Sequence, residues 1–260
     1  MRRVLTRGPL LVLAGALVAG LTLAAPAVAD PVRPKPVKPG SEDDAAVVRR
    51  VLAFEPFTST GVLAGTGWAE CTDPVVWSVD TTNLDRRSSK KVLDALDVSF
   101  RVWSGLSGLR FARGEDTALN FVDDTSIVVP RDGEAQRRHI YIDFVPDADS
   151  KLLSGGVVGL AAPNQYDLTN REIIGGWAAF RSDYVNTATY ANNRALFLHE
   201  LGHVLGLAHS SDAHNSMYAL LHGADLPGSG DVLGLWTLLR PCVNGTPNEL
   251  SQYFPLPPVK

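Results

Sequence analysis

The sequence has no surplus of basic residues, little cysteine, and no hydrophobic run long enough to cross a membrane. Its 260 residues include 24 Lys and Arg against 28 Asp and Glu, a formal net charge of −4. Removal of the first 29 residues, which hold three arginines and no acidic residue, would leave 21 against 28, or −7. Such an acidic chain is a poor partner for nucleic acid or for an anionic membrane surface. No internal repeat is visible.

The first 29 residues have the pattern of an export signal. Three arginines precede an apolar segment, residues 10–23, and residues 27–29 (Ala-Val-Ala) form a small-residue cleavage site. The apolar segment lacks the length and the two charged flanks of a membrane anchor, and no cysteine follows it for lipid attachment. We therefore expect a secreted, extracellular protein whose mature chain starts at Asp30. The arginine pair at positions 2 and 3 leaves a twin-arginine export route open beside the general secretory one.

Composition divides the rest of the chain into three parts. Residues 30–67 start with four prolines within eleven positions and resemble a solvated linker, with a short helix expected over residues 41–54. Whether this stretch is an inhibitory prosegment or only a tether stays open. Residues 68–240 form the expected folded domain, and residues 241–260 form a proline-rich tail. The roughly 230 residues after the signal suffice for one domain with a sizeable core, and we expect a monomer.

Hydrophobic periodicity predicts both strands and helices within the domain. β-Branched and aromatic stretches predict strands, and apolar residues recurring every three or four positions predict helices. The predicted strands cover residues 73–80, 109–111, 139–144 and 173–180, and the predicted helices cover residues 88–104, 191–205 and 231–239. Residues 154–163 are predicted to form a short extended segment closed by Pro163, because proline is tolerated at the edge of a sheet. This order of elements indicates an α+β fold.

The most specific pattern in the sequence begins at His199 and reads H-E-x-x-H-x-x-G-x-x-H. Residues four apart share one face of a helix, so His199 and His203 can aim two imidazoles at one point, with Glu200 beside it. Gly206 can end the helix in a sharp turn, which allows His209 to return as a third ligand. Zinc binds imidazole at about 2.0–2.1 Å in a tetrahedron, and a catalytic zinc keeps its fourth position for water.

A methionine follows this pattern at the expected distance. Residues 215–218 read Asn-Ser-Met-Tyr, and Met217 is the only methionine besides the initiator. The combination resembles the metzincin zinc peptidases, and the stretch from His209 to Tyr218 resembles their matrixin branch. The resemblance spans about residues 68–239. It implies a metzincin-like catalytic domain with a mixed twisted sheet, an active-site helix and a C-terminal helix. The alternative is a helix with surface histidines and a core methionine.

The motif residues and the resemblance together indicate a secreted zinc-dependent endopeptidase of the EC 3.4.24 type. A zinc-activated water would attack the peptide bond, with Glu200 as general base that later passes the proton to the leaving amine. Met217 would form a floor below the histidines without taking part in the chemistry. Two alternatives stay open: a catalytically silent zinc-bearing binding module, and a zinc amidohydrolase acting on a non-peptide amide. The presence of Glu200 argues against the first.

The resemblance also implies where a substrate would bind. In metzincins an extended peptide adds to an edge strand above the site, and Gly159, Leu160 and Ala161 occupy the matching position here. The segment from Tyr218 to residue 221 would wall the pocket for the side chain after the scissile bond. The expected partner is therefore an extended peptide or protein substrate.

The two cysteines, Cys71 and Cys242, are expected to form an intrachain disulfide, because an exported chain meets oxidising conditions. Closing a loop across nearly the whole domain contributes up to about 5 kcal/mol in the chain-entropy model. The alternative comes from the resemblance, since matrixin precursors can be held inactive by a prosegment thiolate on the zinc. The switch motif of that family is absent around Cys71, which favours the disulfide.

The other histidines and the acidic residues give weaker indications. The second, structural zinc of animal matrixins lies on a separate His-rich segment that has no counterpart here, so the resemblance implies one zinc. His139 is expected to be an ordinary packed or surface residue, whereas His214 could orient a metal ligand. Calcium favours oxygen ligands, but no specific loop pattern is matched, so calcium stays possible but unsupported. The aspartates concerned are Asp123, Asp124, Asp143, Asp147 and Asp149.

Overall fold

The computed structural model describes residues 67–68, 73–169, 172–221, 223 and 226–239. The export signal, the helix predicted over residues 41–54, both cysteines with their predicted disulfide, and the C-terminal tail lie outside these residues. Within the described ranges no helix combines the length and the apolar character needed to span a membrane.

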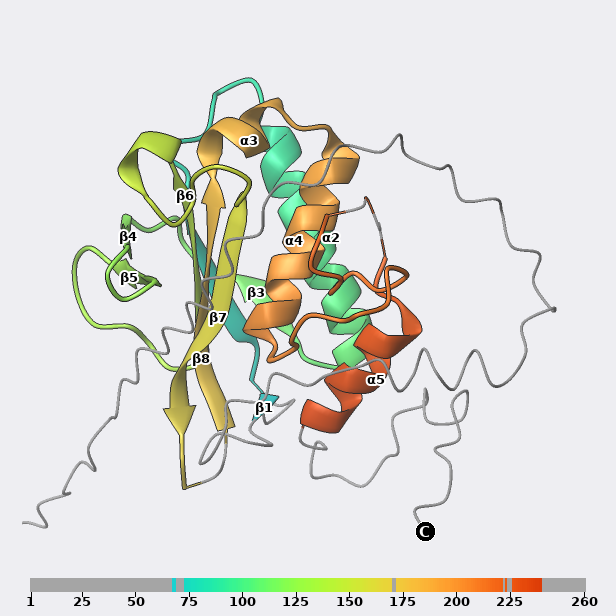
Figure 1. The fold of residues 1–260 in the computed structure, drawn as a ribbon. Helices are drawn as coiled ribbons and strands as arrows, with labels where there is room; N and C mark the ends of the chain where they lie inside the picture. The colour runs from blue at the N-terminus through green and yellow to red at the C-terminus, as the bar shows by residue number, and fades with distance from the viewer. Residues whose placement is uncertain (1–66, 69–72, 170–171, 222, 224–225, 240–260) are drawn as a thin grey trace, which may run out of the picture.

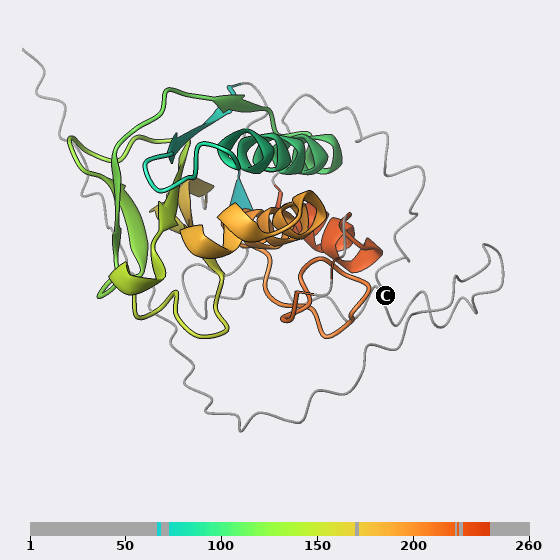
Figure 2. The same cartoon turned by 90° about the horizontal axis from the view of Figure 1, so that it is seen from above.

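The fold has two main layers, a twisted sheet and a set of helices that covers one of its faces (Figures 1 and 2). The strands lie in the order β7-β8-β6-β2-β3, and β1 pairs with the first residues of β8. All neighbours are parallel except β7, which runs antiparallel to β8. The strands are β1 (Gly67–Trp68), β2 (Val75–Asp80), β3 (Phe111–Arg113), β6 (His139–Val145), β7 (Gly159–Asp167) and β8 (Glu172–Arg181). This mixed sheet with a separate helical layer confirms the α+β fold.

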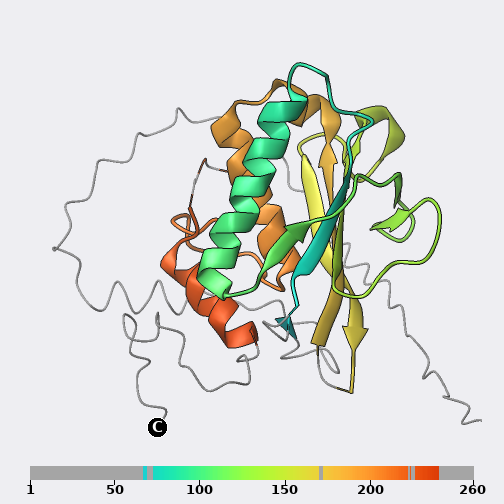
Figure 3. The same cartoon turned by 180° about the vertical axis from the view of Figure 1, so that it is seen from behind.

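Three helices form the second layer. Helix α2 (Ser89–Ser107) and helix α4 (Tyr190–Val204) pack against each other on the sheet, and α5 (Ser229–Leu238) adjoins the C-terminal end of α2 (Figure 3). The indole Nε1 of Trp103 in α2 donates to Leu198 O in α4 at 3.0 Å. Trp236 of α5 donates in the same way to Leu106 O at 2.8 Å. These buried or half-buried hydrogen bonds fix the helices relative to one another.

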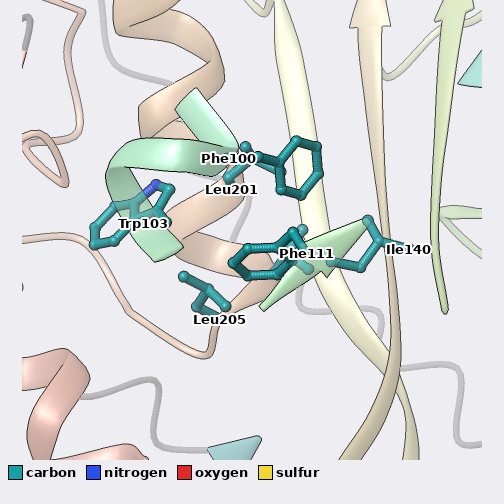
Figure 4. Close-up of a pocket in the computed structure, with 7 residues that line it drawn as sticks. Phe100, Trp103, Phe111, Ile140, Leu201 and Leu205 are labelled. Atoms are coloured by element: carbon teal, nitrogen blue, oxygen red, sulfur yellow. The ribbon is translucent and has the colours of Figure 1, made fainter. Parts of the chain in front are cut away.

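The apolar stripe predicted on α2 points into the core. Val92, Leu96, Phe100 and Trp103 are all buried, and the Phe100 ring stacks on Trp77 of β2 with centroids 4.7 Å apart. The helix ends at Gly108, whose φ of 73° is the left-handed conformation typical of a helix C-terminus. Figure 4 shows how side chains from both helices and the sheet meet between the layers. They are Phe100, Trp103, Phe111, Ile140, Leu201 and Leu205.

Two strand predictions were wrong in their bounds. Strand β3 covers Phe111–Arg113 instead of residues 109–111, because Leu109 is buried in the core just before the strand. The extended segment predicted over residues 154–163 is β7, which starts at Gly159 and continues through Pro163 to Asp167. The pairing of β7 with β8 shifts register directly after Pro163. Such an irregularity accommodates a residue that has no N–H to donate.

A hairpin that the sequence pattern does not predict covers the other face of the sheet. Strands β4 (Leu119–Val122) and β5 (Ile127–Pro130) pair antiparallel. Leu119 and Val128 of the hairpin are buried with Tyr141 and Trp177 of the sheet in a second hydrophobic cluster. Four-residue strands are too short to show a clear alternation, so the pairing depends on contacts with residues distant in the sequence. Short helices α3 (Ser182–Thr187) and η1 (Asp147–Asp149) were also not predicted.

Two buried carboxylates hold this hairpin to the sheet. Asp80, the last residue of β2, is in register with Asp143 of β6, and the two are 4% and 5% exposed. Asp80 accepts from Leu119 N at 2.9 Å, and Asp143 accepts from Phe121 N. Burial acts to raise the pKa of Asp80, but hydrogen bonds and the Arg131 charge outweigh it and lower this pKa. Burial and the charge of Asp80 raise the pKa of Asp143 to about 6.

Replacing Asp143 by asparagine is expected to raise the free energy of unfolding at neutral pH by roughly 1–3 kcal/mol. The folded-state pKa of about 6 lies above the ordinary value of 3.8. The wild type therefore loses stability as pH rises from about 4 to about 6, whereas the neutral amide does not. Urea unfolding at about pH 4 and about pH 8 measures the difference. An equal effect at both values would show that the charge of Asp143 is not its cause.

Candidate active site

Helix α4 carries the first two histidines of the motif and ends near its glycine. The Thr189 side chain caps the helix by accepting from Asn192 N at 3.2 Å. The helix ends at Val204, and Gly206 has a φ of 101°, a left-handed conformation that favours glycine. The chain leaves the helix there and passes on to His209. The exit that the sequence predicts at Gly206 is therefore present.

Three imidazole rings converge beside this exit. His199, His203 and His209 offer ligand atoms that lie within 4.8 Å of one another. The Nε2 atoms of His203 and His209 are 3.2 Å apart. Two nitrogens on one tetrahedral zinc, at about 2.0–2.1 Å each, would be about 3.3 Å apart, so this spacing fits zinc. Within the described part of the chain, no other group of three His, Cys, Asp or Glu side chains is arranged to hold a metal.

Backbone carbonyls fix the tautomers of the two helical histidines. His199 Nδ1 lies 2.7 Å from Ser216 O, and His203 Nδ1 lies 2.7 Å from Leu207 O. A carbonyl can only accept, so each Nδ1 donates its proton and Nε2 is the ring nitrogen that can bind a metal. Burial and the neighbouring histidines lower the pKa of His203 to about 3, and burial lowers the pKa of His209. Both shifts favour the neutral form of the His203 and His209 rings, which is the form that binds metal.

Glu200 lies between the histidines and the edge strand. It is 5% exposed, and a Cβ atom built on Gly159 would lie 2.6 Å from its Oε1. Glycine at that position thus lets the carboxylate pack directly on the backbone of β7. Burial raises the pKa of Glu200 to about 8, and a divalent cation beside it would favour the ionised form. The structure brings together the predicted general base and the first residue of the predicted substrate strand.

The outer edge of β7 offers backbone groups for pairing. Among the described strands only β8 pairs with β7. Leu160 and Ala161 follow Gly159 and are half-buried, with their side chains packed against the two core clusters. Tyr218 and Leu220 follow the motif in the sequence. Tyr218 is half-buried, and Leu220 is 68% exposed. An exposed strand edge of this kind can accept an extended peptide by β-augmentation.

The turn at residues 215–218, which we call the Met-turn, lies directly below the histidines. Met217 is 1% exposed, and its sulfur occupies the space that a side chain on Gly202 would need. Gly202 lies between the two histidines of α4. Ser210 N donates to Met217 O at 2.7 Å, which ties the turn to the segment after His209. The methionine therefore packs under the helix, where the resemblance places it.

Asp231 anchors the Met-turn, a role that the sequence analysis missed. Its buried carboxylate accepts from Ser216 N at 2.6 Å and from Met217 N at 3.3 Å. It also accepts from Gly228 N at 2.8 Å, at the start of α5. Ser216 O is the acceptor for His199 Nδ1, so Asp231 supports a histidine through the turn. Burial raises the pKa of Asp231 despite these bonds. An aspartate in the first turn of a helix was the only signal in the sequence.

Replacing Asp231 by alanine is expected to lower the free energy of unfolding by about 2–4 kcal/mol, because buried N–H groups lose their acceptor. We also expect zinc affinity to fall about tenfold, since His199 loses support. Thermal unfolding and a competitive zinc titration measure the two effects. Asp97, on the surface of α2, gives a control in Asp97→Ala. Unchanged zinc affinity in Asp231→Ala would limit Asp231 to stabilising the fold.

The other residues singled out in the sequence are not part of the group of three histidines. His214 is exposed, and its Nδ1 lies 2.7 Å from Asp212 Oδ1, so this ring nitrogen contacts an aspartate of the same loop. His139 is buried, and its Nε2 lies 3.0 Å from Ser78 Oγ, as expected for a packed residue. The acidic residues considered for calcium are not gathered into one group within the described ranges. Asp123, for example, accepts hydrogen bonds from the loop after η1.

An α+β domain whose central helix and following loop bring three imidazoles together beside a glutamate, above a buried methionine, defines a zinc metallopeptidase of the metzincin class. The matrixin family model matches residues 67–229, which is more than half of the chain. The chain therefore belongs to the matrixin family. No match was found among curated proteins. The match covers the sheet, α2, α4, the three histidines and the Met-turn.

Proposed function

We propose that this matrixin is a secreted zinc-dependent endopeptidase with Glu200 as its general base. One observation carries the proposal: three imidazoles converge beside a buried carboxylate that packs on β7, a strand that pairs only with β8 among the described residues. A structural zinc site would need four protein ligands. In the described residues only the three histidines are available to one metal ion.

His199, His203 and His209 would hold one zinc ion, because their ring nitrogens lie at a suitable spacing. When bound, zinc polarises the scissile carbonyl and lowers the pKa of a coordinated water to around 7. Met217 packs under the helix that carries two of these ligands and helps to keep their spacing. Buried side chains in fixed conformations reduce the reorganisation that the reaction requires.

Glu200 would carry the proton transfers. Its carboxylate accepts a proton from the attacking water while the new C–O bond forms, and gives that proton to the leaving nitrogen as the C–N bond breaks. The substrate would lie along the edge of β7 and pair with the backbone of Gly159, Leu160 and Ala161. Tyr218 would border the pocket for the side chain after the scissile bond.

The test uses the protein purified from the culture medium after export. Casein and a peptide library are incubated with it, with and without a zinc chelator, and again after zinc is restored. We expect cleavage that the chelator abolishes and zinc restores. Zinc binding without cleavage of any peptide would instead indicate a silent binding module, and hydrolysis confined to non-peptide amides would indicate an amidohydrolase.

The same preparation tests the processing predictions. An N-terminus at Asp30 would support the predicted signal cleavage, and a further cut near residue 67 that switches on activity would support an inhibitory prosegment. A protein found only inside the cell with its first residues intact would contradict secretion. Mass spectrometry under non-reducing conditions shows whether Cys71 and Cys242 are bridged.

A further inference from the structure

A single arginine at the end of β8 contacts three segments that lie at the same end of the sheet as the start of β7 (Figure 1). The Arg181 side chain is 16% exposed, and its Nη1 donates to Gly155 O at 2.8 Å. Its Nε lies 3.2 Å from Asp183 Oδ1 in α3, and Nη1 lies 3.9 Å from Asp147 Oδ1 in η1. The guanidinium therefore joins the loop before β7 to two elements of the surrounding fold.

The loop that Arg181 contacts has little packing of its own. Residues 154–157, Ser-Gly-Gly-Val, are all exposed, and Gly155 has a φ of 61°. Adjacent glycines have much conformational freedom to lose when a loop becomes ordered. Arg181 restrains the loop twice, because its backbone N–H also donates to Val158 O at 3.0 Å. The side chain of this one residue thus holds the loop at Gly155, and its backbone holds the loop again at Val158.

This loop leads directly into the backbone that confines Glu200. Gly159, the first residue of β7, is four positions after Gly155 and pairs with Phe180, the neighbour of Arg181. The Glu200 carboxylate packs on Gly159 so closely that no side chain would fit there. A displacement of the loop would therefore move the strand edge and the wall of the Glu200 site together.

We propose that Arg181 is a positioning residue, which fixes the loop before β7 and thereby the strand edge that receives the peptide. The proposal rests on the proposed peptidase function. The loss of Arg181 costs little global stability, because Gly155 O lies in an exposed loop where water can replace the lost donor. Without Arg181 the start of β7 becomes less ordered, and an extended peptide binds more weakly to it.

Arg137 provides a matched control at the opposite end of the same strand. Its Nη2 lies 3.4 Å from Oδ2 of Asp167, the last residue of β7. Arg137→Gln and Arg181→Gln each remove one guanidinium that contacts β7 or the loop before it. Only Arg181 is at the Glu200 end, so the two variants separate an effect on the site from a general loss of charge.

The first measurement is amide hydrogen exchange on the exported full-length protein, followed over peptides that cover residues 152–162. We expect exchange about tenfold faster in Arg181→Gln than in the wild type, and unchanged in Arg137→Gln. If Arg181→Gln does not fold, Asp183→Asn removes the closer of the two ion pairs of the guanidinium and keeps the arginine. That variant should show the same local change at smaller amplitude. Exchange no faster than in Arg137→Gln overturns the proposal.

The second measurement separates KM from kcat with a quenched peptide long enough to lie along β7. For Arg181→Gln we expect KM to rise about tenfold, with zinc content and melting temperature close to those of Arg137→Gln. A merely structural role would reduce the fraction of folded, zinc-loaded protein, which lowers apparent kcat and leaves KM unchanged. An unchanged KM overturns the proposal.

The two proposals fail in different ways. If the zinc-loaded wild type cleaves no peptide, the proposed function is wrong, and hydrogen exchange still tests whether Arg181 orders the start of β7. If the wild type cleaves peptides while Arg181→Gln matches Arg137→Gln in both exchange and KM, the peptidase stands and the positioning role is wrong.

Discussion

Replacing Glu200 by glutamine is expected to lower kcat/KM for peptide hydrolysis by about 10²–10⁴-fold while zinc content stays unchanged. The carboxamide has nearly the same shape as the carboxylate, so it can still pack against Gly159. It cannot accept a proton from water, and the step that depends on a general base is therefore lost. The three histidines keep their positions, because Glu200 is not among the side chains that converge on the metal position.

Glu115→Gln provides the control, since Glu115 is exposed in the segment after β3, away from α4. Activity is compared per bound zinc, measured by elemental mass spectrometry on the same samples. We expect Glu115→Gln to match the wild type in both quantities. Normal turnover by Glu200→Gln would remove this residue from the mechanism, and loss of zinc in that variant would make it part of the metal site instead.

The second large effect is expected for His209→Ala. Removal of this imidazole leaves only two protein ligands. Loss of a residue that hydrogen-bonds to a metal ligand lowers metal affinity by roughly 10–100-fold, and loss of a ligand itself should lower zinc affinity by more. Peptide hydrolysis should fall with it. Because His209 is exposed, the metal-free variant should unfold at nearly the same temperature as the metal-free wild type.

His214→Ala is a closely matched control, because His214 is also exposed and lies in the same loop, paired with Asp212. We expect it to bind zinc and cleave peptides like the wild type. Equal zinc affinity in the two alanine variants would show that His209 is not a ligand. A large loss in His214→Ala would show that the loop rearranges around the metal.

The parts of the site that could be predicted from the sequence are those with a fixed local spacing. Helical periodicity places His199 and His203 on one face, and the left-handed Gly206 explains why His209 returns beside them. The long helix α2 was also predicted well, because its apolar stripe extends over several turns. The matrixin pattern lies in the same short stretch and in the methionine that follows it.

The rest depends on contacts between residues far apart in the chain. No local pattern shows that Gly159 leaves room for the Glu200 carboxylate, or that Asp231 binds the Met-turn. The hairpin formed by β4 and β5 is held by Asp80 and Asp143 from two other strands, so its own short sequence carries little signal. Such contacts join residues that are distant in the sequence, so they can be identified only in the folded structure.

The central claim is that three imidazoles, and no cysteine, hold one zinc ion beside Glu200. Zinc K-edge X-ray absorption on the purified, exported protein tests it most directly. We expect three imidazole nitrogens and one further nitrogen or oxygen ligand at about 2.0–2.1 Å, with one zinc per chain. A sulfur ligand at about 2.3 Å, or fewer than three imidazoles in the outer-shell signal, would contradict it.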